Sequence, residues 1–198
     1  MSTQLESRDP GKDTVTTPIT IAAVVGSLRA ESFSRATFRA ATRLCPDIEW
    51  IEADISDVPL YNQDVEDAGD AGDAVAALKE TVEVANALVF FTPEYNRSIP
   101  AVTKNAVDWL SRPYGRATIS GRTVGIVATV PGGHLGEGVR RHLTDSVSAL
   151  TDGVFDPSIA INSVTHRMHD GEITDEEALT DLGTWLTDFA EYVRDRDS

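Results

Sequence analysis

Polar side chains with complementary chemistry gather in the stretch GSLRAESFSRA (26–36), which follows an apolar run and enters a helical pattern. The residues that offer hydroxyls or a forked cation are Ser27, Arg29, Ser32 and Ser34. Gly26 permits a tight turn, and the start of a helix adds unpaired backbone N–H groups and the positive end of the helix dipole. Together these groups form a cradle for an anion, best suited to a phosphate. The alternative is a serine-rich cap on an ordinary helix.

This candidate cradle differs from two common nucleotide-binding motifs. The stretch lacks GxxxxGK[ST], so it is not the phosphate loop of an ATPase, and it lacks GxGxxG, so it is not a dinucleotide-binding turn. A phosphate held here would therefore belong to another kind of ligand.

A second polar stretch, FTPEYNRSIPAVTKNAVDW (91–109), has the pattern of a strand end, a turn and a helix. Pro93 restricts the exit from the strand, and Tyr95 can supply a flat wall. The backbone of residues 94–96 offers donors and acceptors to a heterocycle. The alternative is a polar connection in which Tyr95 packs on the following helix.

The third stretch, TVPGGHLGEGVRRHL (129–143), holds four glycines, which let a backbone approach a ligand closely. His134 lies among them and is more simply explained as an exposed loop residue than as a catalytic one. His166 and His169 lie in another polar loop beside Asp170, where they lack the spacing of a good zinc site. We therefore expect no metal.

Short apolar runs alternate with helical periodicities along the chain, and these patterns predict the elements that position the three stretches. Strands are expected over 19–26, 48–54, 85–91, 122–130 and 155–162. Helices are expected over 34–44, 73–84, 100–110, 138–150 and 174–193. The alternation predicts an α/β protein with a doubly wound parallel sheet and helices on both faces.

Several residues refine the expected boundaries. Ser98 is expected to cap the helix over 100–110, and Pro100 suits its first turn. Pro157 indicates that the last strand lies at an edge of the sheet. The run TDEE (174–177) has the signature of a helix N-terminus.

The three polar stretches follow the first, third and fourth expected strands. Ligands of doubly wound sheets bind beyond the carboxyl ends of the strands, so the stretches are expected to converge there. A phosphate cradle beside two loops that can hold a flat ring favours a mononucleotide with a planar ring, and flavin mononucleotide (FMN) fits. No Ser–His–Asp arrangement or pair of carboxylates offers a competing chemistry. A flavin carries its own redox chemistry, so no catalytic side chain is expected.

The charge balance excludes one class of partner. Asp and Glu number 32 against 17 Lys and Arg, giving a net charge of −15. Nucleic-acid binding needs a basic footprint, so it is not expected. The acids are scattered, which favours solvation in the high-salt cytoplasm of a halophile, where screening removes self-repulsion. The alternative is an acidic face for a basic partner.

The ends of the chain and its cysteine give three further expectations. Residues 1–17 are polar, without the apolar core of a secretory signal, and are expected to form a disordered leader before a single domain over 18–198. No apolar run approaches the roughly 20 residues of a membrane span. Cys45 is the only cysteine; it excludes a disulfide within the chain and is expected to be a structural thiol.

Four stretches of the chain resemble the NADPH-dependent FMN reductase family, which has the flavodoxin-like fold and includes bacterial quinone, chromate and azo-dye reductases. They are GSLRAESFSR (26–35), DVPLYNQDVE (57–66), TPEYNRSIPAVTKNAVDWLSRP (92–113) and the glycine-rich stretch near 131–143. The resemblance implies a three-layer sandwich around a five-stranded parallel sheet of order 2-1-3-4-5. It also implies FMN as cofactor and NADPH or NADH as co-substrate.

The resemblance further implies how FMN is held. The residues that would hold its phosphate are Ser27, Arg29, Ser32 and Ser34. The residues that would run along the isoalloxazine ring, largely through backbone contacts, are Pro93, Glu94, Tyr95 and Asn96. The residues beside the other edge of the ring would be Pro131, Gly132 and Gly133. A homodimer or homotetramer is implied, with the run DVPLYN (57–62) near the subunit interface and the substrate entrance.

The chain departs from the family pattern at two places. Ser34 stands where the family usually has Asn, and Glu137 and Gly138 stand where the fourth stretch commonly has glycine and arginine. We therefore assign no arginine to the NADPH phosphate.

The expected reaction passes hydride from the nicotinamide to FMN and on to a small-molecule acceptor such as a flavin or a quinone. One alternative is a flavodoxin-like one-electron carrier without NAD(P)H turnover. Another is a binding or regulatory protein that kept the fold without redox turnover.

Overall fold

A computed structural model of the chain describes residues 18–197. The leader expected over 1–17 lies outside the described residues. The main strands are β1 (Ile19–Val25), β2 (Ile48–Ala53), β3 (Ala87–Pro93), β4 (Thr123–Thr129), β5 (Gly153–Val154) and β6 (Ile159–Ile161). The main helices are α1 (Phe33–Leu44), α3 (Asp73–Val84), α4 (Ala101–Leu110), α5 (Glu137–Ser148) and α7 (Glu176–Asp197). Short elements are α2 (Gln63–Asp67), α6 (Val164–Arg167), β7 (Met168–His169) and β8 (Glu172–Ile173).

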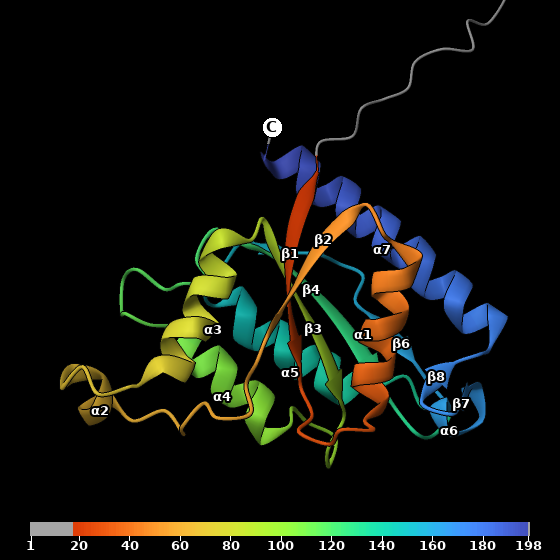
Figure 1. Ribbon diagram of the computed structural model, residues 1–198, viewed down its shortest axis with the longest axis horizontal. Helices are drawn as coiled ribbons and strands as arrows, with labels where there is room; N and C mark the ends of the chain where they lie inside the picture. Colours follow the sequence, from red (N-terminus) through yellow and green to blue (C-terminus); the bar gives the residue numbers. More distant parts are fainter. Residues whose placement is uncertain (1–17, 198) are drawn as a thin grey trace, which may run out of the picture.

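The sheet is parallel, and its strands follow the order β2-β1-β3-β4-β5, with β6 also pairing with β4 (Figure 1). The central strands β1, β3 and β4 are buried along almost their whole length, as their continuous apolar runs predict. The expected α/β class and the strand order 2-1-3-4-5 are confirmed.

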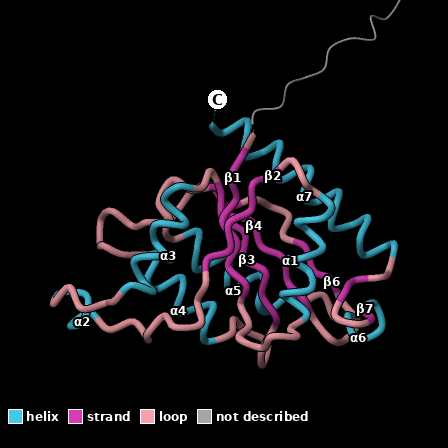
Figure 2. The backbone as a smooth tube through the Cα atoms, viewed as in Figure 1, coloured by secondary structure: helices cyan, strands magenta, loops and turns pink. Residues whose placement is uncertain are grey.

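Helices cover both faces of the sheet, so two apolar cores form (Figure 2). Helices α1 and α7 enclose one core, which centres on the aromatic side chains of Phe91, Trp185 and Phe189. Helices α3, α4 and α5 enclose the other, which includes Phe90 and Trp109. The three layers hold β1, β3 and β4 rigidly, which fixes the loops that leave their carboxyl ends.

Several expected boundaries were wrong. Of the strand expected over 155–162, only β6 lies in this range, and β5 precedes it. The chain leaves the sheet between them at Asp156–Pro157, where proline has no N–H for a ladder hydrogen bond. Ser98 does not cap α4; the N-cap is Pro100, without a side-chain hydrogen bond. The hairpin of β7 and β8 replaces the polar loop expected around Asp170.

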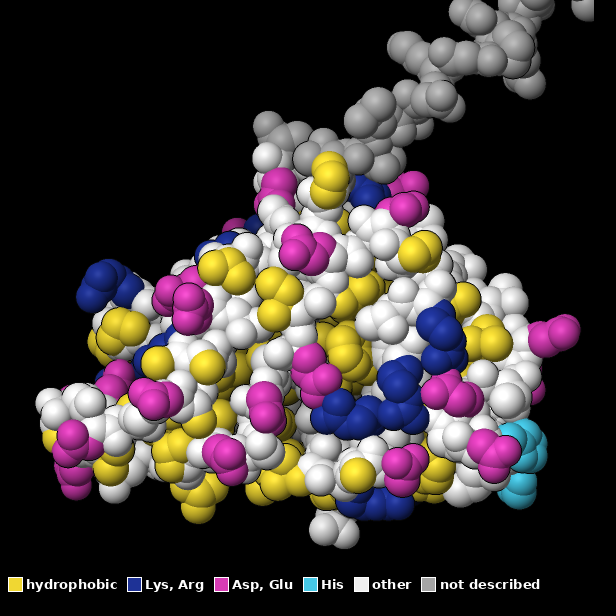
Figure 3. Space-filling view, viewed as in Figure 1, with side chains coloured by type: hydrophobic (Ala, Val, Ile, Leu, Met, Phe, Trp, Pro, Cys, Tyr) yellow, Lys and Arg dark blue, Asp and Glu magenta, His cyan; other side chains and the backbone are white. Residues whose placement is uncertain are grey.

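The surface carries its acids in a scattered way. Figure 3 shows Asp and Glu side chains distributed over the visible face rather than gathered in one patch. Between residues 18 and 197, no helix is both long enough and apolar enough to cross a membrane.

Candidate functional site

The loops after β1, β3 and β4 lie together at the lower edge of the sheet in Figure 1. Gly26 begins the first loop and donates its N–H to the carbonyl of Phe91 at 2.8 Å. A Cβ on Gly26 would overlap Oγ1 of Thr103 and lie 2.8 Å from Oγ1 of Thr92. The chain therefore needs glycine at this position so that β1 can end directly against β3 and α4.

The residues expected to hold a phosphate lie around the N-terminus of α1. Ser32 is the N-cap of this helix, and its Oγ accepts the N–H of Arg35 at 3.1 Å. Ser27 is 4% exposed, and its Oγ accepts the N–H of Arg29 at 3.4 Å. The guanidinium of Arg29 reaches only the carbonyl of Glu31, at 3.5 Å. The loop thus brings two hydroxyls, an exposed cation and a helix N-terminus to one place.

Ser34 belongs to the same turn, but its side chain points into the protein. Its Oγ lies 2.7 Å from Oγ1 of Thr129 at the end of β4, and both residues are buried. Ser34 can therefore offer a ligand only its backbone N–H, because backbone N–H groups in the first turn of a helix have no acceptor within the helix.

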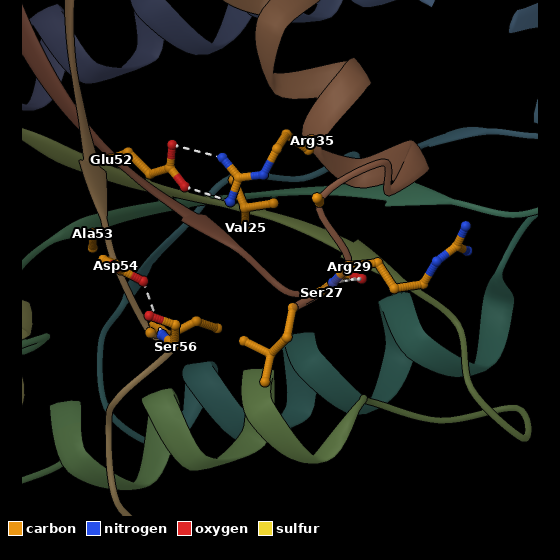
Figure 4. Close-up of a pocket in the computed structure, with 11 residues that line it drawn as sticks. Val25, Ser27, Arg29, Arg35, Glu52, Ala53, Asp54 and Ser56 are labelled. Carbon is orange, nitrogen blue, oxygen red and sulfur yellow. Dashed lines mark hydrogen bonds and ion pairs between the residues drawn. The ribbon is translucent and has the colours of Figure 1, made fainter. Parts of the chain in front are cut away.

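A small cavity of 130 Å³ separates the first loop from the end of β2 (Figure 4). Arg35 reaches across it to Glu52 with two contacts, of 2.8 and 2.9 Å, whereas Arg29 points away from this pair. The hydrogen bond that Arg35 donates to Glu52 holds the pKa of Arg35 above its usual value. Arg35 is therefore paired with Glu52, whereas the exposed Arg29 at the mouth of the loop could pair with a bound anion.

The second loop is a tight hairpin at the end of β3. Tyr95 and Ser98 exchange backbone hydrogen bonds of 3.1 and 2.9 Å. Asn96 and Arg97 occupy the turn with φ of 51° and 63°, the left-handed conformations that a two-residue hairpin turn requires. Tyr95 is 49% exposed, so its ring is available as a wall and does not pack fully on α4.

Glu94 differs from its neighbours because its side chain is 3% exposed. Oε2 accepts the N–H of Val139, in the first turn of α5, at 3.0 Å. Oε1 lies 3.5 Å from Nδ1 of His134. Only the backbone of Glu94 faces the edge of the sheet where the loops meet.

The third loop, from Pro131 to Gly136, is held from behind by the segment before β7. The carbonyl of Gly132 accepts the N–H of Ser163 at 2.8 Å, and that of Pro131 accepts the hydroxyl of Thr165 at 3.2 Å. Gly136 begins α5 with φ of 58°. The ring of His134 folds over Gly132, where a Cβ would lie 3.5 Å from its Cδ2.

A second cavity, of 380 Å³, opens between the first two loops. The residues that line it are Ser27, Leu28, Arg29, Tyr95, Pro100, Ala101 and Val102. Its volume lies in the range of small-molecule sites, and its walls are mostly apolar with polar groups at one end. This arrangement suits a flat ring attached to an anionic group.

The residues that hold the run DVPLYN in place were not predicted from the sequence. Nδ2 of Asn105 and Nε1 of Trp109 donate to the carbonyl of Pro59, at 2.9 and 2.8 Å. Oδ1 of Asn105 also accepts the N–H of Tyr61 at 2.8 Å. Asn105 is an amide at 8% exposure inside an amphipathic helix, and that buried polar position was the available signal.

The remaining candidate residues gather into no second site. Within the described part of the chain, no group of three or more His, Cys, Asp and Glu side chains could hold a metal ion. Cys45 is half-buried, and burial, with a smaller contribution from Asp47, raises the pKa of its thiol. A thiol held protonated in this way is a poor nucleophile, as expected of a structural cysteine.

The strand order β2-β1-β3-β4-β5, with helices on both faces of the sheet, defines a flavodoxin-like α/β protein. The family model for NADPH-dependent FMN reductase matches residues 19–165. The 2-hydroxy-1,4-benzoquinone reductase of a Burkholderia species is 36% identical over 180 residues, which cover 89% of this chain and 97% of that protein. The chain belongs to the NADPH-dependent FMN reductase family.

Two further comparisons agree with this membership. A quinone reductase of Pseudomonas putida is 34% identical over 176 residues, covering 88% of this chain and 94% of the relative. The solved structure of FerB, a flavoenzyme NAD(P)H:(acceptor) oxidoreductase from Paracoccus denitrificans, superposes with a TM-score of 0.80 at 30% identity. It covers 90% of this chain and 98% of FerB. The protein is thus an oxidoreductase with FMN as cofactor and NAD(P)H as reductant.

Proposed function

We propose that the protein reduces a small quinone-type or flavin acceptor with NAD(P)H, using FMN held at the carboxyl edge of the sheet. The observation that carries this proposal is the 380 Å³ cavity, whose polar end is formed by Ser27 and Arg29 and whose apolar walls include Tyr95 and Val102. A bound flavin would supply the redox chemistry, taking hydride from the nicotinamide and passing it to the acceptor. The protein's own groups would bind the flavin and orient it toward the nicotinamide and the acceptor.

In this proposal the FMN phosphate lies at the N-terminus of α1. Ser27 and Ser32 contribute hydroxyls, Arg29 contributes the cation, and Ser34 contributes its backbone N–H because its hydroxyl is paired with Thr129. The donor set suits a phosphate dianion, since cation, hydroxyls and helix N–H groups all favour negative charge.

From the cavity between the first two loops, the ring would extend toward the third loop, so that the second and third loops would contact its two edges. The residues proposed for its two edges are Pro93, Glu94, Tyr95 and Asn96 on one side and Pro131, Gly132 and Gly133 on the other. Glu94 would contribute its backbone alone, since its carboxylate is buried against α5.

Further features complete the proposal. Residues 18–198 would act as one FMN-binding domain. The protein would work in the cytoplasm of a halophile, in keeping with its charge of −15. It would assemble as a homodimer or homotetramer.

An anaerobic titration tests the proposed reaction. Purified protein in high salt is mixed with FMN, and NADPH or NADH is then added while the flavin absorbance is recorded. Bleaching of bound flavin by either nucleotide, followed by return of the yellow colour on adding a benzoquinone, is the expected result. Bound flavin that stays yellow would indicate a one-electron carrier, and protein that binds no flavin would indicate a binding or regulatory role.

A further inference from the structure

The carboxylate of Glu94 links the second and third loops of the site. Its backbone belongs to the turn after β3, but its side chain crosses to the start of α5 and is 3% exposed. A buried carboxylate is costly unless it is hydrogen-bonded. Its hydrogen-bond donor, the N–H of Val139, lies in the first turn of α5, directly after the third loop. The ring of His134, 3.5 Å from Oε1, lies within that loop.

Helix α5 begins without a cap of its own. Its N-cap is Gly136, which has no side chain that could accept a first-turn N–H. Val139 is the third residue of this helix, the position whose N–H a capping side chain usually accepts. Glu94 performs this role from another loop, and its negative charge is favourable at the positive end of the helix dipole.

Gly138 shows how closely the two segments meet. A Cβ at this position would overlap the carbonyl oxygen of Arg97 and lie 2.7 Å from the carbonyl carbon. One turn further along α5, Nδ1 of His142 lies 3.0 Å from Oγ of Ser98. The first turns of α5 therefore rest directly on the backbone of the hairpin turn.

We propose that Glu94 is a positioning residue, whose side chain caps α5 from outside and clamps the two loops that form opposite edges of the flavin site. The clamp fixes the separation between Tyr95 and the Pro131–Gly133 segment. Its effect on FMN binding rests on the proposed function, in which these segments contact the flavin ring. Gly138 is the matching half of the clamp, since only glycine lets α5 approach the turn this closely.

The clamp is tested first without cofactor. Hydrogen exchange of the apoprotein should show a protected Val139 amide, and Glu94→Ala should remove most of that protection. Glu94→Gln keeps an acceptor oxygen of the same reach and should retain it. Equal protection in wild type and Glu94→Ala would overturn the proposal, whether or not the protein binds FMN.

The second test measures FMN. Loss of a cap is worth about 1 kcal/mol, so Glu94→Ala should weaken FMN binding by up to roughly fivefold. At saturating FMN and nucleotide, Glu94→Ala should also slow flavin reduction, and Glu94→Gln should restore both affinity and rate to within about threefold. Unchanged FMN affinity and reduction rate in Glu94→Ala would overturn the role in positioning. Wild-type protein without FMN affinity would instead overturn the proposed function, while the exchange test still decides the cap.

Gly138→Ala disturbs the same contact from the α5 side, and it tests the clamp even if Glu94→Ala fails to fold. It should expose the Val139 amide to exchange and weaken FMN binding. Gly183→Ala is its matched control, since Gly183 also lies within a helix and an added Cβ there would meet only Cδ1 of Leu44, at 4.0 Å. Equal FMN affinity in the two alanine variants would contradict the clamp.

Discussion

The hydroxyl of Ser34 lies 2.7 Å from the hydroxyl of Thr129, although the two residues are 95 positions apart. Ser34 is in the first turn of α1 and Thr129 is the last residue of β4, so the pair joins the expected phosphate cradle to the strand that leads into the third loop. Both side chains are buried, at 1% and 0% exposure.

Replacing Ser34 by alanine should therefore affect stability more than FMN affinity. Ser34→Ala leaves the Thr129 hydroxyl buried without its partner, which costs about 1 to 3 kcal/mol. The backbone N–H that we propose for the phosphate remains, so FMN affinity should change by less than about threefold, under 1 kcal/mol. Chemical denaturation and flavin titration measure the two effects. A large loss of affinity with unchanged stability would show that the hydroxyl itself holds the ligand.

Ser32 offers a substitution that separates the cap of α1 from the cradle. Aspartate is as good an N-cap as serine, so Ser32→Asp should keep the stability of the protein, whereas Ser32→Ala should lose about 1 kcal/mol. Ser32→Asp also places a negative charge beside the proposed phosphate and should abolish FMN binding. Thermal unfolding and flavin titration of both variants check this, and normal FMN binding by Ser32→Asp would exclude the cradle as the phosphate site.

Arg29 should distinguish a ligand with a phosphate from one without. Arg29→Ala removes a charge-assisted contact and should weaken FMN binding by about tenfold or more, on the order of 1.5 to 3 kcal/mol. Riboflavin, which has no phosphate, should bind the variant and the wild type equally. Arg43→Ala is the matched control, because Arg43 lies at the other end of α1 and pairs with Glu172. An equal loss for FMN and riboflavin would mean that Arg29 acts on the ring or on the fold.

Asn105 should matter for the acceptor rather than for FMN. Asn105→Ala removes the acceptor of the Tyr61 N–H and a donor to Pro59, so the run DVPLYN should loosen at a cost of about 1 to 3 kcal/mol. The KM for a benzoquinone should rise, since this run is expected near the substrate entrance. Asn86→Ala is the control: Asn86 also bonds a backbone N–H, that of Thr20, but lies at the amino end of β3. Equal KM values in both variants would place the run outside the entrance.

The charge of −15 should make stability depend on salt. Raising KCl from 0.1 to 1 M shortens the screening length from about 10 to about 3 Å and weakens repulsion among scattered carboxylates. The unfolding temperature of the apoprotein should rise over this range. A temperature that falls or stays constant would contradict adaptation to a high-salt cytoplasm.

The sequence by itself determined the layers of this protein. Continuous apolar runs identified β1, β3 and β4, and helical periodicity identified α1 to within one residue and α3 without error. These patterns are local, since each depends on residues that neighbour one another along a strand or a helix. The order of polar stretches after buried strands also predicted that these stretches lie together at the carboxyl edge of the sheet, as they do.

Only the tertiary structure decided which way each polar side chain points. Ser34 and Ser32 belong to one serine-rich run, but one hydroxyl turns to Thr129 and the other caps α1. Glu94 lies in an exposed turn, but its carboxylate is buried against α5. The orientations of Ser34 and Glu94 depend on partners tens of positions away, which packing of the three layers brings within hydrogen-bond distance. A local pattern carries no information about that distance, so the sequence could predict that the three polar stretches lie together at the carboxyl edge of the sheet, while the buried contacts of Glu94 could not be predicted.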